Sequence, residues 1–179
     1  MNELNGLRVR FINIRRRPAS PQQGLIAVGP TVFPCALGRS GISALKREGD
    51  GATPFAVLPV LHGYRKSPLK ALRSPLSIQE IPRNLGWCDA PSDPNYNRPV
   101  RLPFHASHES MLRADPLYDV CVVLDWNISE RRRNRGSAIF LHIARPGLHP
   151  TEGCIAVSPA TMRRLLPHLS RRTRLRICR

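Results

Sequence analysis

A cysteine and a histidine near the C-terminal end of the chain are of the residue types needed for nucleophilic catalysis. His142 ends an apolar run, and Cys154 follows twelve residues later, directly after Gly153. A thiol attacks a carbonyl carbon when a neighbouring base removes its proton, and an imidazole is such a base. Gly153 permits a sharp turn and close approach of a substrate, and its amide and that of Cys154 would then point at a developing oxyanion. The pattern indicates acyl transfer by a cysteine nucleophile.

Other interpretations of these residues stay open at this level. A cysteine is often a small packed core residue, and a histidine at a strand end is often hydrogen-bonded locally. His149 lies between the pair and is a second candidate base, although His142 is preferred because it ends the strand. His105 and His108 form a candidate metal pair that lacks an obvious third ligand.

The other four cysteines, Cys35, Cys88, Cys121 and Cys178, have no comparable surroundings. Cys121 lies in an apolar run and is typical of a small core residue. No CxxC pair occurs, so a structural zinc site is not expected, and the odd number of cysteines leaves at least one thiol free.

The elements that must position the pair are mostly strands. Apolar alternation or continuous apolar runs predict strands over residues 7–14, 25–28, 32–37, 53–61, 119–124, 137–143 and 175–178, with a turn at Gly29-Pro30. A reversal after the strand that ends near His142, followed by a second short strand, would bring the histidine and the cysteine side by side. Residues 64–117 have weak periodicity, with a short helix over 107–113, and a stretch of this length is typical of a functional loop or an insertion.

One clear helix is predicted near the C-terminus. Ser158 is a good N-cap, and Pro159 suits the first helical position. Pro167 ends or kinks the helix. Helical spacing gives a buried face formed by Met162, Leu165, Leu166 and Leu169.

The bulk composition limits the class of protein. A chain of 179 residues with 41% hydrophobic and 22% charged residues is expected to form one domain with its own core. No stretch approaches the roughly 20 apolar residues needed to cross a bilayer, and residues 1–10 lack the apolar segment of a secretory signal. The net charge of +16 comes mostly from arginine clusters, which form either a solvated surface or a binding face for nucleic acid, anionic lipid or wall polymer.

Two motifs carry a resemblance to a known family. Residues 137–142 (SAIFLH) followed by 151–155 (TEGCI) resemble the signature of the L,D-transpeptidase catalytic domain family (YkuD type), and residues 46–54 (KREGDGATP) are similar to the segment with which that family enters its strands. Tyr96-Asn97, Ser107-His108-Glu109 and Tyr118-Asp119 resemble features of one bacterial branch. The resemblance implies a mainly-β fold, a mixed sandwich-like sheet with one C-terminal helix packed on it. It covers residues 25–179, after an N-terminal segment and first strand over 1–24.

The resemblance also implies roles for individual residues. Cys154 would be the nucleophile, and His142 the base that later protonates the leaving amine. The carbonyl of Ile143 would orient the imidazole, and Gly153 would shape the turn before the nucleophile. Substrate contacts are expected from Thr151, Glu152, Tyr96, Asn97 and Glu109, although Tyr96 could equally be a core residue and Glu109 an ordinary surface charge.

The implied reaction is acyl transfer on peptidoglycan, with no metal or nucleotide cofactor. The cysteine would attack the carbonyl at the L-centre of a diamino acid in a stem tetrapeptide and release D-alanine. An amine acceptor then gives a cross-link, whereas water gives carboxypeptidase activity. The resemblance places the protein in the periplasm or at the cell wall, without a nucleic acid partner.

Departures from the family pattern concern substrate contacts rather than acylation. Ala156 stands where the family often has arginine, Glu152 where it often has histidine, and the loop between His142 and Cys154 is short. Two alternative functions stay open. A related hydrolase would use the same pair on an L,D bond, and a non-catalytic basic protein would bind polyanions with an affinity that falls with salt and survives Cys154→Ala.

Overall fold

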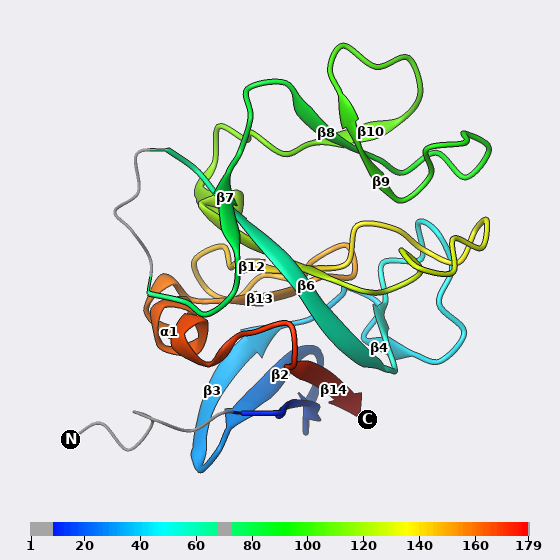
Figure 1. Ribbon diagram of the computed structural model, residues 1–179. Coiled ribbons are helices and arrows are strands. Elements are labelled where there is room, and N and C mark those ends of the chain that lie inside the picture. The colour runs from blue at the N-terminus through cyan, green and yellow to red at the C-terminus, as the bar shows by residue number, and fades with distance from the viewer. Residues whose placement is uncertain (1–8, 68–72, 179) are drawn as a thin grey trace.

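The fold is built around one large sheet that closes on itself. The computed structural model describes residues 9–67 and 73–178. Its large sheet contains β1 (Phe11–Arg17), β2 (Ser20–Val28), β3 (Thr31–Ala36), β6 (Val57–Arg65), β7 (Ile78–Glu80), β11 (Val120–Leu124), β12 (Phe140–Ile143), β13 (Ile155–Val157) and β14 (Arg174–Cys178). The strand order is β11-β12-β13-β3-β2-β1-β14-β6-β7, and β11 also pairs with β6, so all strands except β7 form a closed barrel (Figure 1).

The interior of this barrel is the main hydrophobic core. Side chains alternate between the two faces of a strand, so every second residue points inward. In the parallel pair β1 and β14, Ile12 lies opposite Leu175 and Ile14 opposite Ile177, and all four are at most 2% exposed. Burial of each such side chain stabilises the fold by about 1.5–3 kcal/mol. The apolar alternation seen in the sequence therefore builds the barrel.

A second, smaller sheet covers part of the outside of the barrel. It contains β8 (Leu85–Cys88), β9 (Arg98–Arg101) and β10 (His108–Ser110) in the order β10-β8-β9. Trp87 of β8 packs with Cys121, Val123 and Phe140 of β11 and β12 in a second buried cluster, separate from the barrel interior. Figure 1 shows this sheet at the opposite end of the molecule from β1 and β14. The weakly periodic region of the sequence therefore forms a cap on the barrel.

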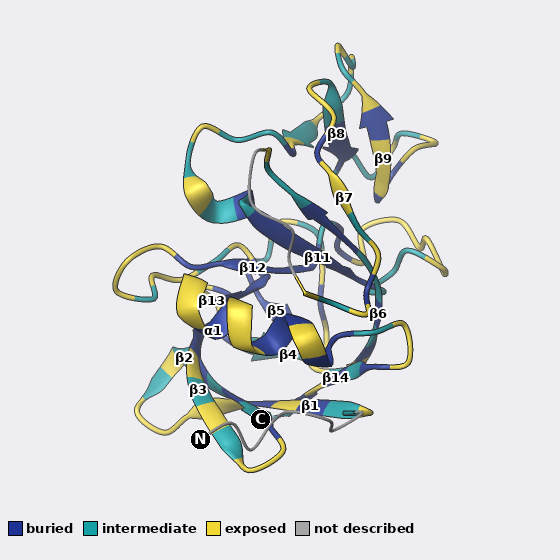
Figure 2. Cartoon of the chain, turned by 60° about the vertical axis from the view of Figure 1, so that its left-hand side comes forward, coloured by how far each residue is buried: buried dark blue, intermediate teal, exposed yellow. Residues whose placement is uncertain are grey.

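The helix lies where the sequence predicts it. The helix α1 (Pro159–Leu165) begins after Ser158, whose Oγ accepts a hydrogen bond from Thr161 N at 3.1 Å, and a 3₁₀ turn, η2 (Leu166–His168), follows it. The predicted apolar face is buried against the barrel core, and the opposite side is exposed (Figure 2). The mainly-β fold with one C-terminal helix is thus confirmed.

Several element boundaries differ from the prediction. The predicted strand over 137–143 begins only at Phe140, because Ala138 has a positive φ of 50° and leaves the extended conformation. The predicted strand over 53–61 is divided between β5 (Thr53–Pro54), which pairs with β4 (Ile42–Ser43), and β6. The helix predicted over 107–113 is wrong: His108–Ser110 pair with β8, which satisfies their backbone hydrogen bonds in a sheet instead.

The N-terminal part of the described chain is integral to the barrel. β1 pairs with both β2 and β14, and residue 24, the predicted end of the N-terminal segment, lies inside β2. Residues 7 and 8 of the first predicted strand and most of the segment tested for a secretory signal lie outside the described residues. In the described ranges, no helix has the length and apolar character needed to span a membrane.

Candidate active site

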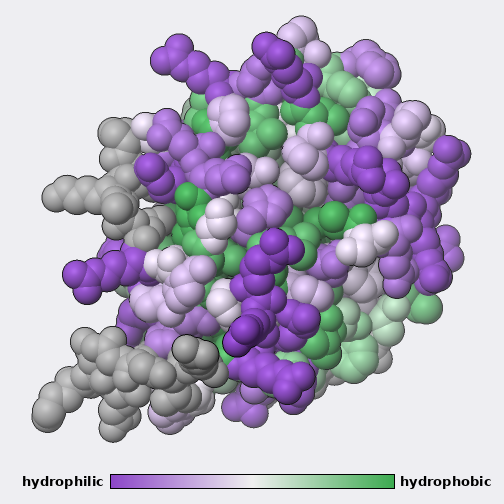
Figure 3. Space-filling model, in the orientation of Figure 1, coloured by the Kyte–Doolittle hydropathy of each residue, from purple (hydrophilic) through white to green (hydrophobic). Residues whose placement is uncertain are grey.

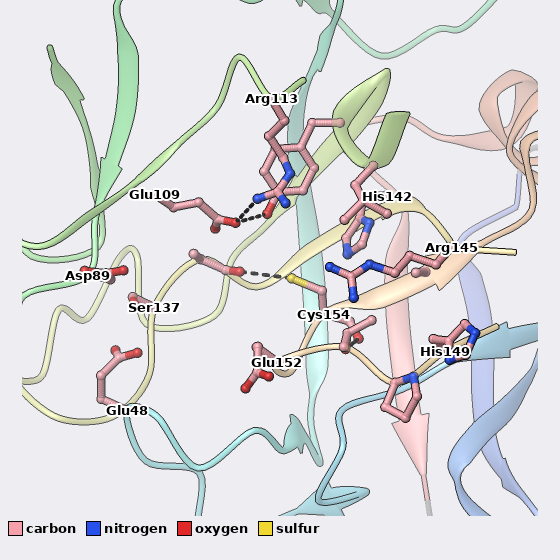
Figure 4. Close-up of a pocket in the computed structure, with 16 residues that line it drawn as sticks. Glu48, Asp89, Glu109, Arg113, Ser137, His142, Arg145, His149, Glu152 and Cys154 are labelled. Carbon is pink, nitrogen blue, oxygen red and sulfur yellow. Dashed lines mark hydrogen bonds and ion pairs between the residues drawn. The ribbon is translucent and has the colours of Figure 1, made fainter. Parts of the chain in front are cut away.

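The candidate base lies in β12, and the candidate nucleophile directly precedes the neighbouring strand β13. β12 and β13 are parallel, with His142 opposite Ala156. The simple reversal expected between them is therefore wrong, and residues 144–154 instead carry the chain back to the start of β13. Cys154 lies two residues before Ala156, so it points to the same face of the sheet as His142. This is the outer face of the barrel, under the cap sheet, and both side chains line one pocket of about 260 Å³ (Figure 4).

Gly153 and Thr151 shape the turn that presents Cys154. Gly153 has a φ of 132°, and a Cβ at this position would lie 2.8 Å from the carbonyl oxygen of Ala52. The Thr151 hydroxyl accepts a hydrogen bond from Gly153 N at 3.2 Å and donates one to Cys154 O at 2.6 Å. The Gly153 amide, expected to point at an oxyanion, is therefore used inside the turn. The Thr151 hydroxyl is likewise engaged with the backbone, although the residue lines the pocket.

The Cys154 sulfur is held by the backbone that precedes β12. Its thiol donates a hydrogen bond to Ala138 O at 3.1 Å, and Phe140 N donates one to the sulfur at 3.3 Å. Ala138 is in turn held by Asn97, whose Oδ1 accepts from Ala138 N at 3.0 Å. The residue is only 8% exposed. Burial, reinforced by the nearby Glu109 carboxylate and partly opposed by the Phe140 amide, raises the pKa of Cys154 to about 12.

His142 has a defined tautomer. Its Nδ1 lies 2.8 Å from Ile143 O, and because a carbonyl oxygen only accepts, Nδ1 carries the proton. In the neutral ring, Nε2 then carries the lone pair that can accept a proton. The ring packs edge-to-face on Tyr118, with centroids 5.4 Å apart. Burial lowers the pKa of His142 to about 4, against the opposing effect of the Ile143 carbonyl. The pair in the free site is therefore a neutral thiol and a neutral imidazole at pH 7.

Four carboxylates line the pocket: Glu48, Asp89, Glu109 and Glu152. They are a third of the twelve acidic residues in a chain of net charge +16, so the pocket is acidic within a basic protein. Glu109 accepts hydrogen bonds from Tyr118 Oη at 2.7 Å and Arg113 Nη1 at 3.4 Å, and burial raises its pKa. Glu152 is at the exposed rim, paired with Arg39 at 2.7 Å.

Two polar atoms of the pocket wall are buried without a hydrogen-bond partner. These are Asp89 Oδ1 and Ser137 Oγ, which faces the Tyr96 phenol without a hydrogen bond of normal geometry. Both residues lie with Glu48 on one side of Cys154, whereas Arg145 and His149 lie on the other (Figure 4). Buried polar atoms in native proteins nearly always have a hydrogen-bond partner. Two such atoms without a partner in one pocket therefore mark a place where a hydrogen-bond donor of a ligand would bind.

Tyr96 and Asn97 do not line the pocket; both are buried behind residues of its wall. Tyr96 is buried and its hydroxyl donates to Glu48. Asn97 is fully buried, and its Oδ1 accepts from Trp87 Nε1 and Ala138 N while its Nδ2 donates to Trp126 O at 2.9 Å. Asn97 is therefore a positioning residue, because it holds the segment that holds the sulfur.

The segment 46–54, which carried part of the family resemblance, builds the loop beside Gly153. Lys46 is 3% exposed and donates to Asp50 Oδ1 at 2.6 Å. The Asp50 carboxylate also accepts from the amides of Arg47 and Ala52, and these donors lower its pKa against the effect of burial. The rigid loop places the Ala52 carbonyl against Gly153.

The remaining candidates lie outside the pocket. His105 interacts with Asp93 at 3.4 Å, and His108 Nδ1 donates to Ala106 O at 2.7 Å. Within the described ranges, no three His, Cys, Asp or Glu side chains come together as metal ligands. Cys35, Cys88 and Cys121 are buried free thiols in the core or cap, and Cys178 is half-buried.

Sequence reasoning missed several residues of the pocket wall, namely Glu48, Asp89, Arg113, Ser137 and Arg145. They come from the 46–54 loop, the cap and the ends of β12. Only their presence in motif-bearing segments gave any signal. Their convergence depends on the tertiary fold.

Comparison with known proteins gives one match. The model of the L,D-transpeptidase catalytic domain family (YkuD) matches residues 22–177, which is most of the chain. No curated protein and no solved structure matches the chain. The matched range includes the barrel from β2 to β14, the cap, and both members of the Cys154 and His142 pair.

Proposed function

Because the chain belongs to the L,D-transpeptidase catalytic domain family, whose members are cysteine enzymes acting on peptidoglycan, we propose that it is a peptidoglycan L,D-transpeptidase. Cys154 is the nucleophile and His142 the base. The observation that carries the proposal is that both side chains line one pocket, His142 from β12 and Cys154 from the turn that leads into the adjacent β13, with His142 Nδ1 bound to Ile143 O. That hydrogen bond leaves Nε2 as the basic atom.

Acylation starts from the neutral pair. As the sulfur attacks the carbonyl at the L-centre of the stem tetrapeptide, the thiol proton passes to His142 Nε2. The tetrahedral intermediate collapses when the imidazolium protonates the amine of D-alanine, which leaves. The products are a thioester on Cys154 and a neutral His142. Proton transfer coupled to attack avoids a free thiolate, which the burial of Cys154 disfavours.

The second half-reaction transfers the acyl group to an amine. The acceptor amine loses a proton to His142 Nε2 as it attacks the thioester, and the proton returns to the departing sulfur. Water in place of the amine would give the carboxypeptidase product. Cys154 is 8% exposed, so the thioester is reached only through the pocket. An amine acceptor therefore competes with the smaller water molecule only if the pocket also binds the acceptor.

The charges of the pocket suit a zwitterionic stem peptide. Ala156 stands where many family members carry arginine, and Arg145 supplies a guanidinium to the same pocket. We assign Arg145 to a carboxylate of the substrate. Asp89 Oδ1 and Ser137 Oγ, together with Glu109, are assigned to its side-chain ammonium, which would satisfy both unpaired atoms.

The test is product analysis on purified muropeptides with Cys154→Ala. We expect loss of turnover to background with an unchanged melting temperature, because one small side chain changes. Cys178→Ala, at the far end of β14, is the matched control and should keep full activity. Full activity of Cys154→Ala would overturn the mechanism.

The acceptor is identified by the same assay with and without an added amine. A transpeptidase yields the cross-linked or exchanged product in proportion to the amine. A hydrolase yields only the shortened stem peptide, whatever amine is present, and that result would replace transfer by hydrolysis on the same Cys154 and His142 pair.

A further inference from the structure

The acidic residues of this chain are confined to one part of the molecule. Of the twelve acidic residues, Glu3 is near the N-terminus and the other eleven lie between residues 48 and 152. No acidic residue occurs in the helix α1 or in the strands β1, β2, β3, β6, β13 and β14. Because β1 lies four strands from β12 in either direction around the barrel, the acid-free strands β2, β1 and β14 are on the side opposite the pocket.

The outer side of these strands combines arginines with apolar side chains. Ile12, Ile14, Leu175 and Ile177 point into the core, so alternation puts the residues between them outside. We call this surface the arginine face, and it consists of Phe11, Asn13, Arg15, Arg174, Arg176 and the neighbouring Val57 of β6. Arg176 lies directly opposite Val57 in the β14–β6 pair, and Val57 is 50% exposed. In Figure 3, hydrophobic residues appear among hydrophilic ones in the lower part of the molecule, where β6 begins and β14 ends.

The arginines of this face are not neutralised. In the described part of the chain, none of Arg15, Arg174 and Arg176 forms an ion pair with a carboxylate. Arg176 instead lies over the ring of Phe11, with Cζ 4.3 Å from its centroid, and Arg10 lies 5.6 Å from the same ring. Such stacking holds Arg176 beside an aromatic ring and leaves its charge uncompensated. Arg174 Nη1 donates to Arg171 O at 3.2 Å and to Thr173 O at 3.3 Å, and these neutral carbonyl partners also leave its charge uncompensated.

We propose that the arginine face docks on an anionic lipid bilayer. Arginine N–H groups would bind lipid phosphates, while the exposed Val57 enters the boundary between headgroups and acyl chains. A second copy of the chain is disfavoured, because two identical cationic faces repel. A soluble polyanion would pair with the arginines but would gain nothing from the apolar side chains between them. Docked in this way, the enzyme presents its pocket away from the bilayer.

The proposal is tested by sedimentation of the full chain with vesicles of phosphatidylcholine, with and without phosphatidylglycerol. We expect binding only to the anionic vesicles, weakening as salt increases. Arg15→Gln with Arg176→Gln should weaken binding roughly 25-fold, since each arginine near an anionic surface contributes about five-fold. Arg98→Gln with Arg101→Gln, two exposed arginines of β9 in the cap, has the same charge change and should have little effect.

A second variant separates a bilayer from a soluble polyanion. Val57→Ser should weaken vesicle binding about three-fold or more, because an exposed apolar side chain is lost. It should leave binding to heparin unchanged. Two results would overturn the proposal in favour of non-specific polyanion binding. One is an equal loss of vesicle affinity in both double arginine variants, and the other is an unchanged vesicle affinity in Val57→Ser. Turnover of soluble muropeptides should be unchanged in all variants, so this result is independent of the proposed catalytic function.

Discussion

At the scale of the residue, the notable property of the site is that both reacting groups are neutral at rest. Burial raises the pKa of Cys154 and lowers that of His142, so an ion pair does not form in the free enzyme. The thiol instead donates a hydrogen bond to Ala138 O. The substrate must therefore displace this hydrogen bond, and proton transfer to His142 accompanies attack rather than preceding it.

The pH dependence of turnover follows from the His142 imidazole. A base works only when unprotonated, and a pKa lowered to about 4 keeps His142 neutral in mildly acidic solution. We expect kcat/KM to stay flat from about pH 7 to about pH 5 and to fall near pH 4. Circular dichroism at each pH is the control for unfolding. An acid limb near 6.5, the ordinary imidazole value, would show that another group or a more exposed ring is the base.

The proposed function assigns the substrate ammonium to Asp89. Asp89→Asn removes the charge but keeps the shape, and we expect kcat/KM to fall about 10- to 100-fold for a stem peptide with a free side-chain amine. The N-acetylated peptide, which lacks the ammonium, should give the same low kcat/KM with the wild type and with Asp89→Asn. Glu130→Gln, an exposed carboxylate outside the pocket, serves as the control. A loss of the same size on both peptides would assign Asp89 a structural role.

At the scale of the element, the site depends on how two parallel strands are joined. The segment between β12 and β13 must end in a turn tight enough to aim Cys154 at the outer face of the barrel. Gly153 makes this turn possible because it has a positive φ and presses against the Ala52 carbonyl. The loop at 46–54 therefore acts on the nucleophile through this steric contact, and the positive charge of Lys46 also lowers the pKa of Cys154 against the larger effect of burial.

Gly153→Ala is expected to misplace the nucleophile. The new Cβ would lie 2.8 Å from Ala52 O, so the turn must shift, and a displacement of about 1 Å can cost roughly 100-fold in kcat. Gly49→Ala is a matched control: its φ is also positive, at 71°, but a Cβ there meets nothing within 4 Å. It should lose about 1 kcal/mol of stability and keep its kcat. Similar kcat losses in the two variants would attribute the effect to backbone strain alone.

At the scale of the whole molecule, a buried neutral histidine links folding stability to pH. The folded-state pKa of His142 is below its unfolded value of 6.5. As the pH falls below 6.5, the unfolded chain takes up a proton that the folded chain does not, so the free energy of unfolding decreases until about pH 4. The contribution lost by pH 5 is about 2 kcal/mol, at 1.36 kcal/mol per pH unit.

Urea denaturation at pH 7 and pH 5 measures this contribution. His142→Gln cannot take up a proton, so the difference in unfolding free energy between the two pH values should be about 2 kcal/mol smaller in this variant than in the wild type. Other titrating groups, including the half-buried His62, whose pKa is lowered by burial, affect both proteins equally. An identical pH dependence in the two proteins would mean that His142 is not buried in its neutral form.

Local pattern in the sequence was sufficient for the mainly-β class, most strand positions, the capped helix after Ser158, and the candidate pair Cys154 and His142. These features depend on neighbouring residues: alternation determines which face of a strand is apolar, and an N-cap acts within one turn. The 107–113 helix failed because strand pairing between distant segments outweighed local preference.

The closure of the barrel and the composition of the pocket wall were decided only by the tertiary structure. Closure requires β6 to pair with β11, which is more than fifty residues away in the chain. The same folding brings Glu48, Asp89 and Ser137 together from three separate loops and turns Asn97 from an expected substrate contact into a buried support. Long-range pairing of this kind leaves no periodic trace in the sequence, because its partners are chosen by packing rather than by spacing.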